Sequence, residues 1–151
     1  MPEHELEALF GTSYFRVLIG REELGFAEVT RLASVTDLEV PAEERRDRFE
    51  TVVLRRALSR DTKLYDWRRS IVDGKNDRRQ VTIHQLESAG GRIVNSWRLV
   101  RAWPCRWSGP SFNAQSSDVA VEELELAFDD LVWLRSRQRQ RQRSRPTTQG
   151  A

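Results

Sequence analysis

The sequence predicts a mainly β fold: a small β-sandwich or barrel with one flanking α-helix. Two observations point to this class. Alternating apolar and polar residues recur in about six or seven short segments separated by turn residues, and a single segment has clear helical spacing. The 151 residues make about one domain, and a hydrophobic content of 38% allows one modest core.

Three strands are predicted in the N-terminal part of the chain. The first runs from Tyr14 to Ile19 and has apolar side chains at every second position. A polar connection over 20–25, with a glycine at each end, leads like a hairpin loop into a second strand at 26–32. A third strand is predicted over 49–58 because its centre is apolar.

A long charged stretch, residues 33–48, separates the second and third strands. It has little periodicity, so the sequence predicts either an exposed loop or a short solvated helix after Pro41. Its charged residues are the first set of contact candidates: Asp37, Glu39, Glu43, Glu44, Arg45, Arg46, Asp47 and Arg48.

The clearest helix is predicted over 62–72. Asp61 and the threonine after it offer an N-cap. Leu64, Trp67 and Ile71 then follow at helical spacing, and turn residues end the segment.

Three further strands are predicted in the second half, at 78–87, 92–102 and 118–128. Pro104 and the Gly109-Pro110 pair are expected to break the chain between the last two. In the last strand alternate residues share one face, namely Ala120, Glu122, Leu124, Leu126 and Phe128.

The two ends of the chain differ from its body in composition. Residues 1–13 are expected to form a mobile acidic arm, 14–134 the folded domain, and 135–151 a disordered basic tail. The tail holds six arginines and no acid, so removing it changes the net charge from +2 to −4. Three readings of the tail stay open: a solvated extension, a contact with an acidic surface of a neighbouring subunit or partner, or electrostatic binding of nucleic acid.

The sequence shows no candidate for catalysis, metal binding or cofactor binding. His4, His84 and Cys105 are too few for a four-ligand zinc site, and no phosphate-binding glycine loop or nucleophile elbow is present. Glu123 and Glu125 share a strand face, as a glycosidase pair would, but a solvated or subunit-facing surface explains them better. With one cysteine, no intrachain disulfide is possible.

No signal peptide or membrane-spanning segment is expected. The first residues are acidic, where a signal peptide needs positive charge. No apolar run approaches the roughly 20 residues that a spanning helix requires.

The tryptophans admit two interpretations. Trp97, Trp103 and Trp107 cluster within eleven residues, while Trp67 and Trp133 stand apart. Large rings fill small cores, but tryptophan is also enriched at subunit interfaces. Both interpretations are expected to hold, for different rings.

The order of several motifs resembles the tail-tube proteins of contractile phages and related contractile injection systems. The similarity covers about residues 14–131. The matching segments are Tyr14-Phe15-Arg16-Val17-Leu18-Ile19-Gly20, Gly25-Phe26-Ala27-Glu28-Val29, Leu54-Arg55-Arg56, Leu64-Tyr65-Asp66-Trp67, Trp97-Arg98-Leu99-Val100-Arg101-Ala102-Trp103-Pro104, and Asn113-Ala114-Gln115-Ser116 leading to Val119–Ala127.

The chain departs from this family at three places. Residues 33–50 lack the glycine-rich segment and the Leu-Pro-Gly turn usual in main-tube members, Ala57 stands where a glycine often follows, and the basic tail is additional. Two assignments therefore stay open: the main tube subunit of a divergent system, or a paralogue that begins the tube at the baseplate.

The resemblance implies a structural role without catalysis. In such proteins six copies form a ring with an inner β-barrel, and the rings stack into a tube inside a sheath. The expected partners are the chain itself, the sheath protein, and a baseplate hub or other tube paralogues. Cargo in the lumen is compatible with this role, and assembly is expected in the bacterial cytoplasm. The rival hypothesis is a small nucleic-acid-associated adaptor acting through the tail, although nucleic acid is not expected to bind the folded body.

The resemblance also assigns contact regions. Strand faces around 14–32, 78–87 and 118–128 are expected to supply lumen or neighbour contacts, and residues 37–50 to supply inter-ring or partner contacts. The second set of candidates, for subunit interface or core, is Phe26, Glu28, Trp97, Trp103, Asn113, Glu122 and Glu125.

Overall fold

The computed structural model describes Gly11 and residues 13–135, and this part of the chain is mainly β, as predicted. The predicted N-terminal arm, apart from Gly11 and Ser13, and the tail beyond Arg135 lie outside the described residues. The elements are β1 (Phe15–Ile19), β2 (Glu22–Leu24), β3 (Glu28–Val29), β4 (Ser34–Val35), the 3-10 turn η1 (Ala42–Glu44), β5 (Arg48–Phe49), β6 (Val52–Ala57), α2 (Lys63–Val72), β7 (Arg79–Leu86), β8 (Ile93–Ser108), β9 (Val121–Ala127) and β10 (Asp130–Leu134).

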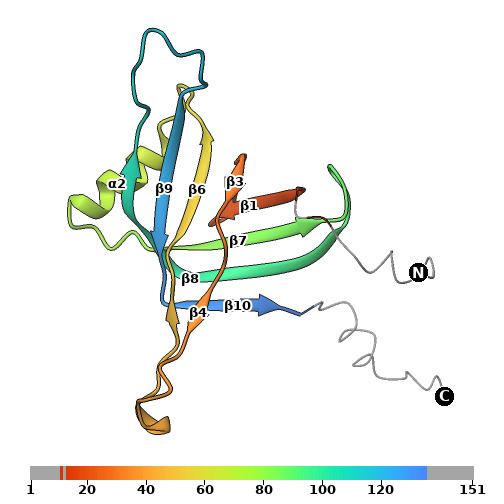
Figure 1. Ribbon diagram of the computed structural model, residues 1–151, viewed down its shortest axis with the longest axis vertical. Helices are drawn as coiled ribbons and strands as arrows, with labels where there is room; N and C mark the ends of the chain where they lie inside the picture. The colour runs from red at the N-terminus through yellow and green to blue at the C-terminus, as the bar shows by residue number, and fades with distance from the viewer. Residues whose placement is uncertain (1–10, 12, 136–151) are drawn as a thin grey trace, which may run out of the picture.

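One long strand, β8, joins the two layers of the sandwich. Its first half lies between β7 and β10, where Trp97 is opposite both Ile83 and Trp133. Its second half pairs with β9, and the layer continues in the order β9-β6-β3. Figure 1 shows β6 and β9 running across the direction of β1, β7 and the first half of β8.

The corner between the layers falls at Arg101. This residue has φ of 53°, a left-handed conformation that is uncommon for a residue with a side chain. Its Nε binds Asp129 Oδ2 at 2.9 Å, and Arg78 Nη1 binds the other oxygen of that carboxylate at 3.1 Å. The loop between β9 and β10 is therefore tied to the point where β8 turns.

The predicted chain break at Pro104 is wrong. Pro104 lies buried inside β8 opposite Leu126, and the register shifts between Pro104 and Arg106. A proline lacks the N–H of a regular ladder, and a bulge is one of the few places where a strand accepts it. The strand ends instead at Ser108, before the predicted break at Gly109-Pro110.

Several strand boundaries differ from the prediction. The polar connection over 20–25 contains β2, so the turn is tighter and centres on Gly20, which has φ of 63°. The strand predicted over 26–32 is reduced to β3, and the one predicted over 49–58 divides into β5 and β6. The strand β10 was not predicted.

The core lies between the two layers and is closed by α2. Its fully buried side chains include Val17, Val52, Leu54, Leu64, Trp67, Val81, Leu99, Leu124 and Leu126. The helix falls where it was predicted and contributes Leu64 and Trp67 to this core. The Trp67 indole N–H donates to the carbonyl of Asp77 at 2.7 Å, which fixes the ring in the core. Among the described residues, no helix is long and apolar enough to cross a membrane.

Candidate functional site

The charged stretch forms a hairpin arm, residues 33–50, that projects from the body (Figure 1). β4 pairs with β5 at its base, and η1 forms part of its far end after Pro41. The structure thus combines the two predicted alternatives, an exposed loop and a short helical turn, on a two-stranded stem. All eight contact candidates between Asp37 and Arg48 are exposed.

The arm is held together by its own hydrogen bonds. Thr36 Oγ1 donates to Asp47 Oδ1 at 2.8 Å across the stem. Arg45 donates to the carbonyls of Val40 and Leu38 at 3.0 and 3.3 Å. The side chain of Leu38 is 75% exposed. The end of the arm therefore has a defined shape but contributes nothing to the core of its own subunit.

Within the described part of the chain, one layer of the sandwich has two unpaired edges. In the layer β2-β1-β7-β8-β10, both β2 and β10 have a partner strand on one side only. On β10, Trp133 is 64% exposed although its ring packs 5.5 Å from Trp97. Unpaired edges are templates for pairing with another chain.

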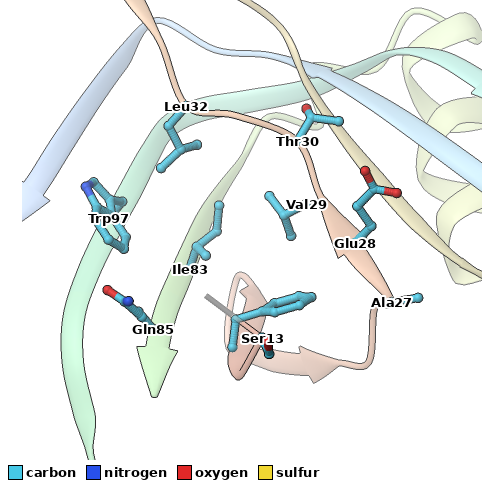
Figure 2. Close-up of a pocket in the computed structure, with 10 residues that line it drawn as sticks. Ser13, Ala27, Glu28, Val29, Thr30, Leu32, Ile83, Gln85 and Trp97 are labelled. Carbon is cyan, nitrogen blue, oxygen red and sulfur yellow. The ribbon is translucent and has the colours of Figure 1, made fainter. Parts of the chain in front are cut away.

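An apolar groove opens between the β3 segment and the layer formed by β1, β7 and β8 (Figure 2). Val29 and Leu32 line one wall, and Ile83 and Trp97 line the other. Its volume is about 600 Å³. Trp97, an interface or core candidate, therefore contributes to this groove.

Two further candidates, Phe26 and Glu122, belong to a buried polar cluster. Glu122 is 2% exposed. Its carboxylate accepts hydrogen bonds from Arg56 Nε at 2.6 Å and from the Trp107 indole N–H at 3.0 Å. The Arg56 guanidinium lies 5.9 Å from the centre of the Phe26 ring, a cation–π contact. These residues therefore stabilise the subunit itself.

Arg56 also links this cluster to the start of α2. Its Nη1 and Nη2 donate to the Asp61 side chain and carbonyl at 3.2 and 3.3 Å. The Asp61 pKa is lowered, first because its carboxylate accepts the Lys63 backbone N–H and also because of the positive charge of Arg56. Sequence reasoning missed these partners, although an acid on the same strand face as Leu124 and Leu126 signals a buried charge.

The remaining acidic candidates lie on the outer face of β9 and β3. Arg55 pairs with Glu28 at 3.2 Å and with Glu123 at 2.7 Å. Glu125 lies beside Cys105, whose thiol pKa is raised by burial and by that carboxylate. Glu123 is thus part of a surface ion pair, and Glu125 faces a thiol.

Trp103 and Asn113 are placed in two separate regions. The Trp103 ring lies 6.0 Å from the guanidinium of Arg78, near the corner of β8. Asn113 accepts the backbone N–H of Gln115 at 3.0 Å in the exposed loop before β9. Neither residue lines the groove. Within the described ranges, no cluster of three metal-binding side chains occurs.

Comparisons with a family model and with solved structures both match this chain to tail-tube proteins and their structural relatives. The model of the family described as T4-like virus tail tube protein gp19 matches residues 11–132. The chain is similar to a protein in the sheath-tube complex of the extracellular contractile injection system PVC in its extended state, with 24% identity over 87% of this chain and 95% of that one and a TM-score of 0.71. No curated protein matches.

Two other solved structures share the fold. A chain in the structure of the tube-terminating cap of the anti-feeding prophage has 19% identity over 85% of this chain and 92% of that one, with a TM-score of 0.67. Hcp1 from Flavobacterium johnsoniae has 11% identity over 79% of this chain and 93% of that one, with a TM-score of 0.57. At such identities the similarity establishes a common fold.

Proposed function

The chain belongs to the T4-like virus tail tube protein family. From this premise we propose that six copies close into a ring. Such rings then stack into the inner tube of a contractile tail or injection system. Its role in a tail tube is structural. The number six comes from the resemblance to tail-tube proteins. The observation that supports ring closure is the pair of unpaired edges on one layer.

The two edges fit a head-to-tail ring. β2 and β10 lie at opposite ends of the same layer, so β10 of one copy can pair with β2 of the next. Such a contact joins two different surfaces, and repetition of it closes into a ring when the rotation allows. Closure leaves no edge strand of this layer exposed.

The lumen then faces the side of this layer that is turned away from the core. Val17 and Leu99 point inward and are buried. The side chains next to them in sequence point to the other face, and the strand register aligns Leu18, Thr82, Arg98 and Val132 in one row across the layer. We assign this row to the wall of the lumen.

The arm supplies the contact between rings. Its far end is exposed and charged, so it is free to contact another copy, while Phe49 at its base packs on Phe128 of the body. Deletion of 38–46 tests this directly, because the Thr36–Asp47 bond across the stem allows a short turn to replace the removed segment. The expected product is a folded subunit that forms rings but no rods in electron micrographs, while the exposed control Lys75→Ala forms rods. Normal rods from the deletion variant would refute the role of the arm.

The subunit could occupy either of two positions in the tube: along its length or at its start. A main-tube subunit would contact the sheath protein along the length of the particle. The second candidate is a subunit that begins the tube at the baseplate, and the missing glycine-rich connection in residues 33–50 keeps it open. Electron micrographs of the purified chain separate the two candidates, since a main-tube subunit forms rods and an initiating subunit forms single rings. The prediction for the basic tail concerns residues outside those described, and we assign it no role.

A further inference from the structure

We propose that the Trp133 side chain of one copy inserts into a small pocket beside β2 of the next copy in the ring. This inference rests on the proposed ring and goes further, because it names the side chain and the pocket that join two subunits. Pairing of the edges β10 and β2 involves backbone groups and by itself specifies no side chain.

Trp133 is a large apolar side chain that is exposed at a sheet edge and already held in one position. Its side chain is 64% exposed. Its ring packs 5.5 Å from the ring of Trp97, and its indole N–H donates to Asn95 Oδ1 at 3.2 Å. A side chain fixed in this way loses little freedom on binding, and tryptophan is enriched among the residues that anchor interfaces.

The matching pocket lies between β2 and α2. Its volume is about 260 Å³, which is below the roughly 300–1,000 Å³ of pockets for drug-sized ligands. A space of this size suits one large side chain. The apolar part of its lining consists of Ile19, Leu24, Leu64 and Trp67.

The strand register places Trp133 and this pocket on the same face and in the same row of the layer. Trp133 is opposite Trp97, and Trp97 is opposite Ile83. Ile83 is opposite Val17, which in turn is opposite Leu24. Directly opposed residues point to the same face of a sheet, and Val17 and Ile83 are buried in the core. When β10 of one copy meets β2 of the next, Trp133 therefore arrives beside Leu24.

The charges at the two edges are also complementary. Two of the three acids that line the pocket already form ion pairs with its two bases. The third acid, Asp66, is exposed and accepts Thr62 Oγ1 at 2.9 Å, but it forms no ion pair within the described residues. Arg135 follows β10 directly and is exposed. It brings a positive charge to the same contact, and opposite charges across an interface favour the correct orientation.

Disulfide trapping tests the contact. With Cys105 replaced by serine, Trp133→Cys and Leu24→Cys are expected to form bonds between copies on oxidation, giving a ladder of covalent oligomers that ends at six. Within one copy the two positions are separated by four strand spacings, about 19 Å, which no disulfide spans. The matched control is Val132→Cys with Leu24→Cys, which should form no bond because Val132 points to the other face of β10.

The oxidation is carried out at a protein concentration at which the reduced variant forms rings in electron micrographs. Rings without a bond between Trp133→Cys and Leu24→Cys would overturn this inference and leave the proposed ring standing. Equal bond formation in the control would also overturn it, because the edges would then meet in no fixed register. Absence of rings from the unaltered chain at any concentration would refute the proposed ring and this inference with it.

Truncation of the anchor gives an independent measurement. Trp133→Ala should raise the concentration at which half of the subunits are in rings by on the order of thirtyfold, the effect of losing an interface anchor. Leu58→Ala shortens an exposed apolar side chain next to β6 in the other layer and should change that concentration by about twofold at most. Circular dichroism of the dilute variants checks that both subunits are folded. Ring formation unchanged by Trp133→Ala would overturn the proposal.

Discussion

Removal of one carboxylate, Glu122, is expected to destabilise the subunit strongly. Glu122 is 2% exposed and Arg56 is 8% exposed, and they are joined at 2.6 Å. Glu122→Ala leaves the buried guanidinium without this partner and also removes the acceptor of the Trp107 indole N–H. Breaking a buried pair from one side costs about 3–5 kcal/mol, out of a total stability of about 5–15 kcal/mol for a typical domain.

Urea denaturation followed by tryptophan fluorescence measures this loss. With a slope of about 1–3 kcal/mol per molar urea, the midpoint of unfolding should fall by roughly 2 M. Glu123→Ala is the matched control, because that neighbouring side chain is 37% exposed and pairs with the exposed Arg55. Its cost should stay below about 1 kcal/mol.

A double variant tests the physical reason. Arg56→Met with Glu122→Leu replaces the ion pair with apolar groups, and it should recover much of the stability lost in Glu122→Ala because no buried charge is left unpaired. The reasoning is refuted if Glu122→Ala and Glu123→Ala are equally mild. It is also refuted if the double variant is less stable than Glu122→Ala.

Three other predictions concern the corner of β8, one acid and one thiol. Arg101→Gly should change the midpoint of thermal unfolding little, because relief of the left-handed conformation, worth about 1–2 kcal/mol, offsets the loss of an exposed ion pair. Arg101→Val should lower this midpoint. Equal effects of the two substitutions on the midpoint would contradict the reasoning. The Asp77 pKa is lowered below its ordinary 3.8, first by hydrogen bonds from Arg79, so this carboxylate stabilises the fold above that pH and the benefit is lost as pH falls further. Asp77→Asn should therefore flatten the loss of stability as the pH falls below about 4, and an unchanged slope would count against this account. Because burial raises the Cys105 thiol pKa, alkylation at neutral pH should be much slower in the folded protein than in urea, and similar rates would exclude this account.

The elements predicted well are those specified by local sequence. The helix α2 follows from the spacing of Leu64, Trp67 and Ile71, and it ends within a residue of the predicted boundary. β9 follows from strict alternation, since every second side chain is buried, and β7 from alternation as far as Ile83. In both cases the pattern in a short window already identifies the buried face.

The elements missed depend on distant partners. β10 has little alternation of its own and exists as a strand because it pairs with the first half of β8. The continuation of β8 through Pro104 likewise requires the bulge against β9. Short windows contain no information on either pairing.

The sites divide in the same way. Exposure of the charged arm was predictable because its sequence offers almost nothing to a core. The partner of Glu122 was not, because Arg56 lies 66 positions earlier in the chain. The groove was also not predictable, since its walls come from four segments that meet only in the folded structure.

Electron microscopy of the purified full chain, with averaging of end-on views, tests the assignment to a tube most directly. We expect hollow rings with six-fold symmetry whose inner wall is the layer β2-β1-β7-β8-β10, joined edge to edge between neighbouring copies. Single subunits with no ring at any concentration, or rings whose inner wall is formed by β6 and β9, would contradict it.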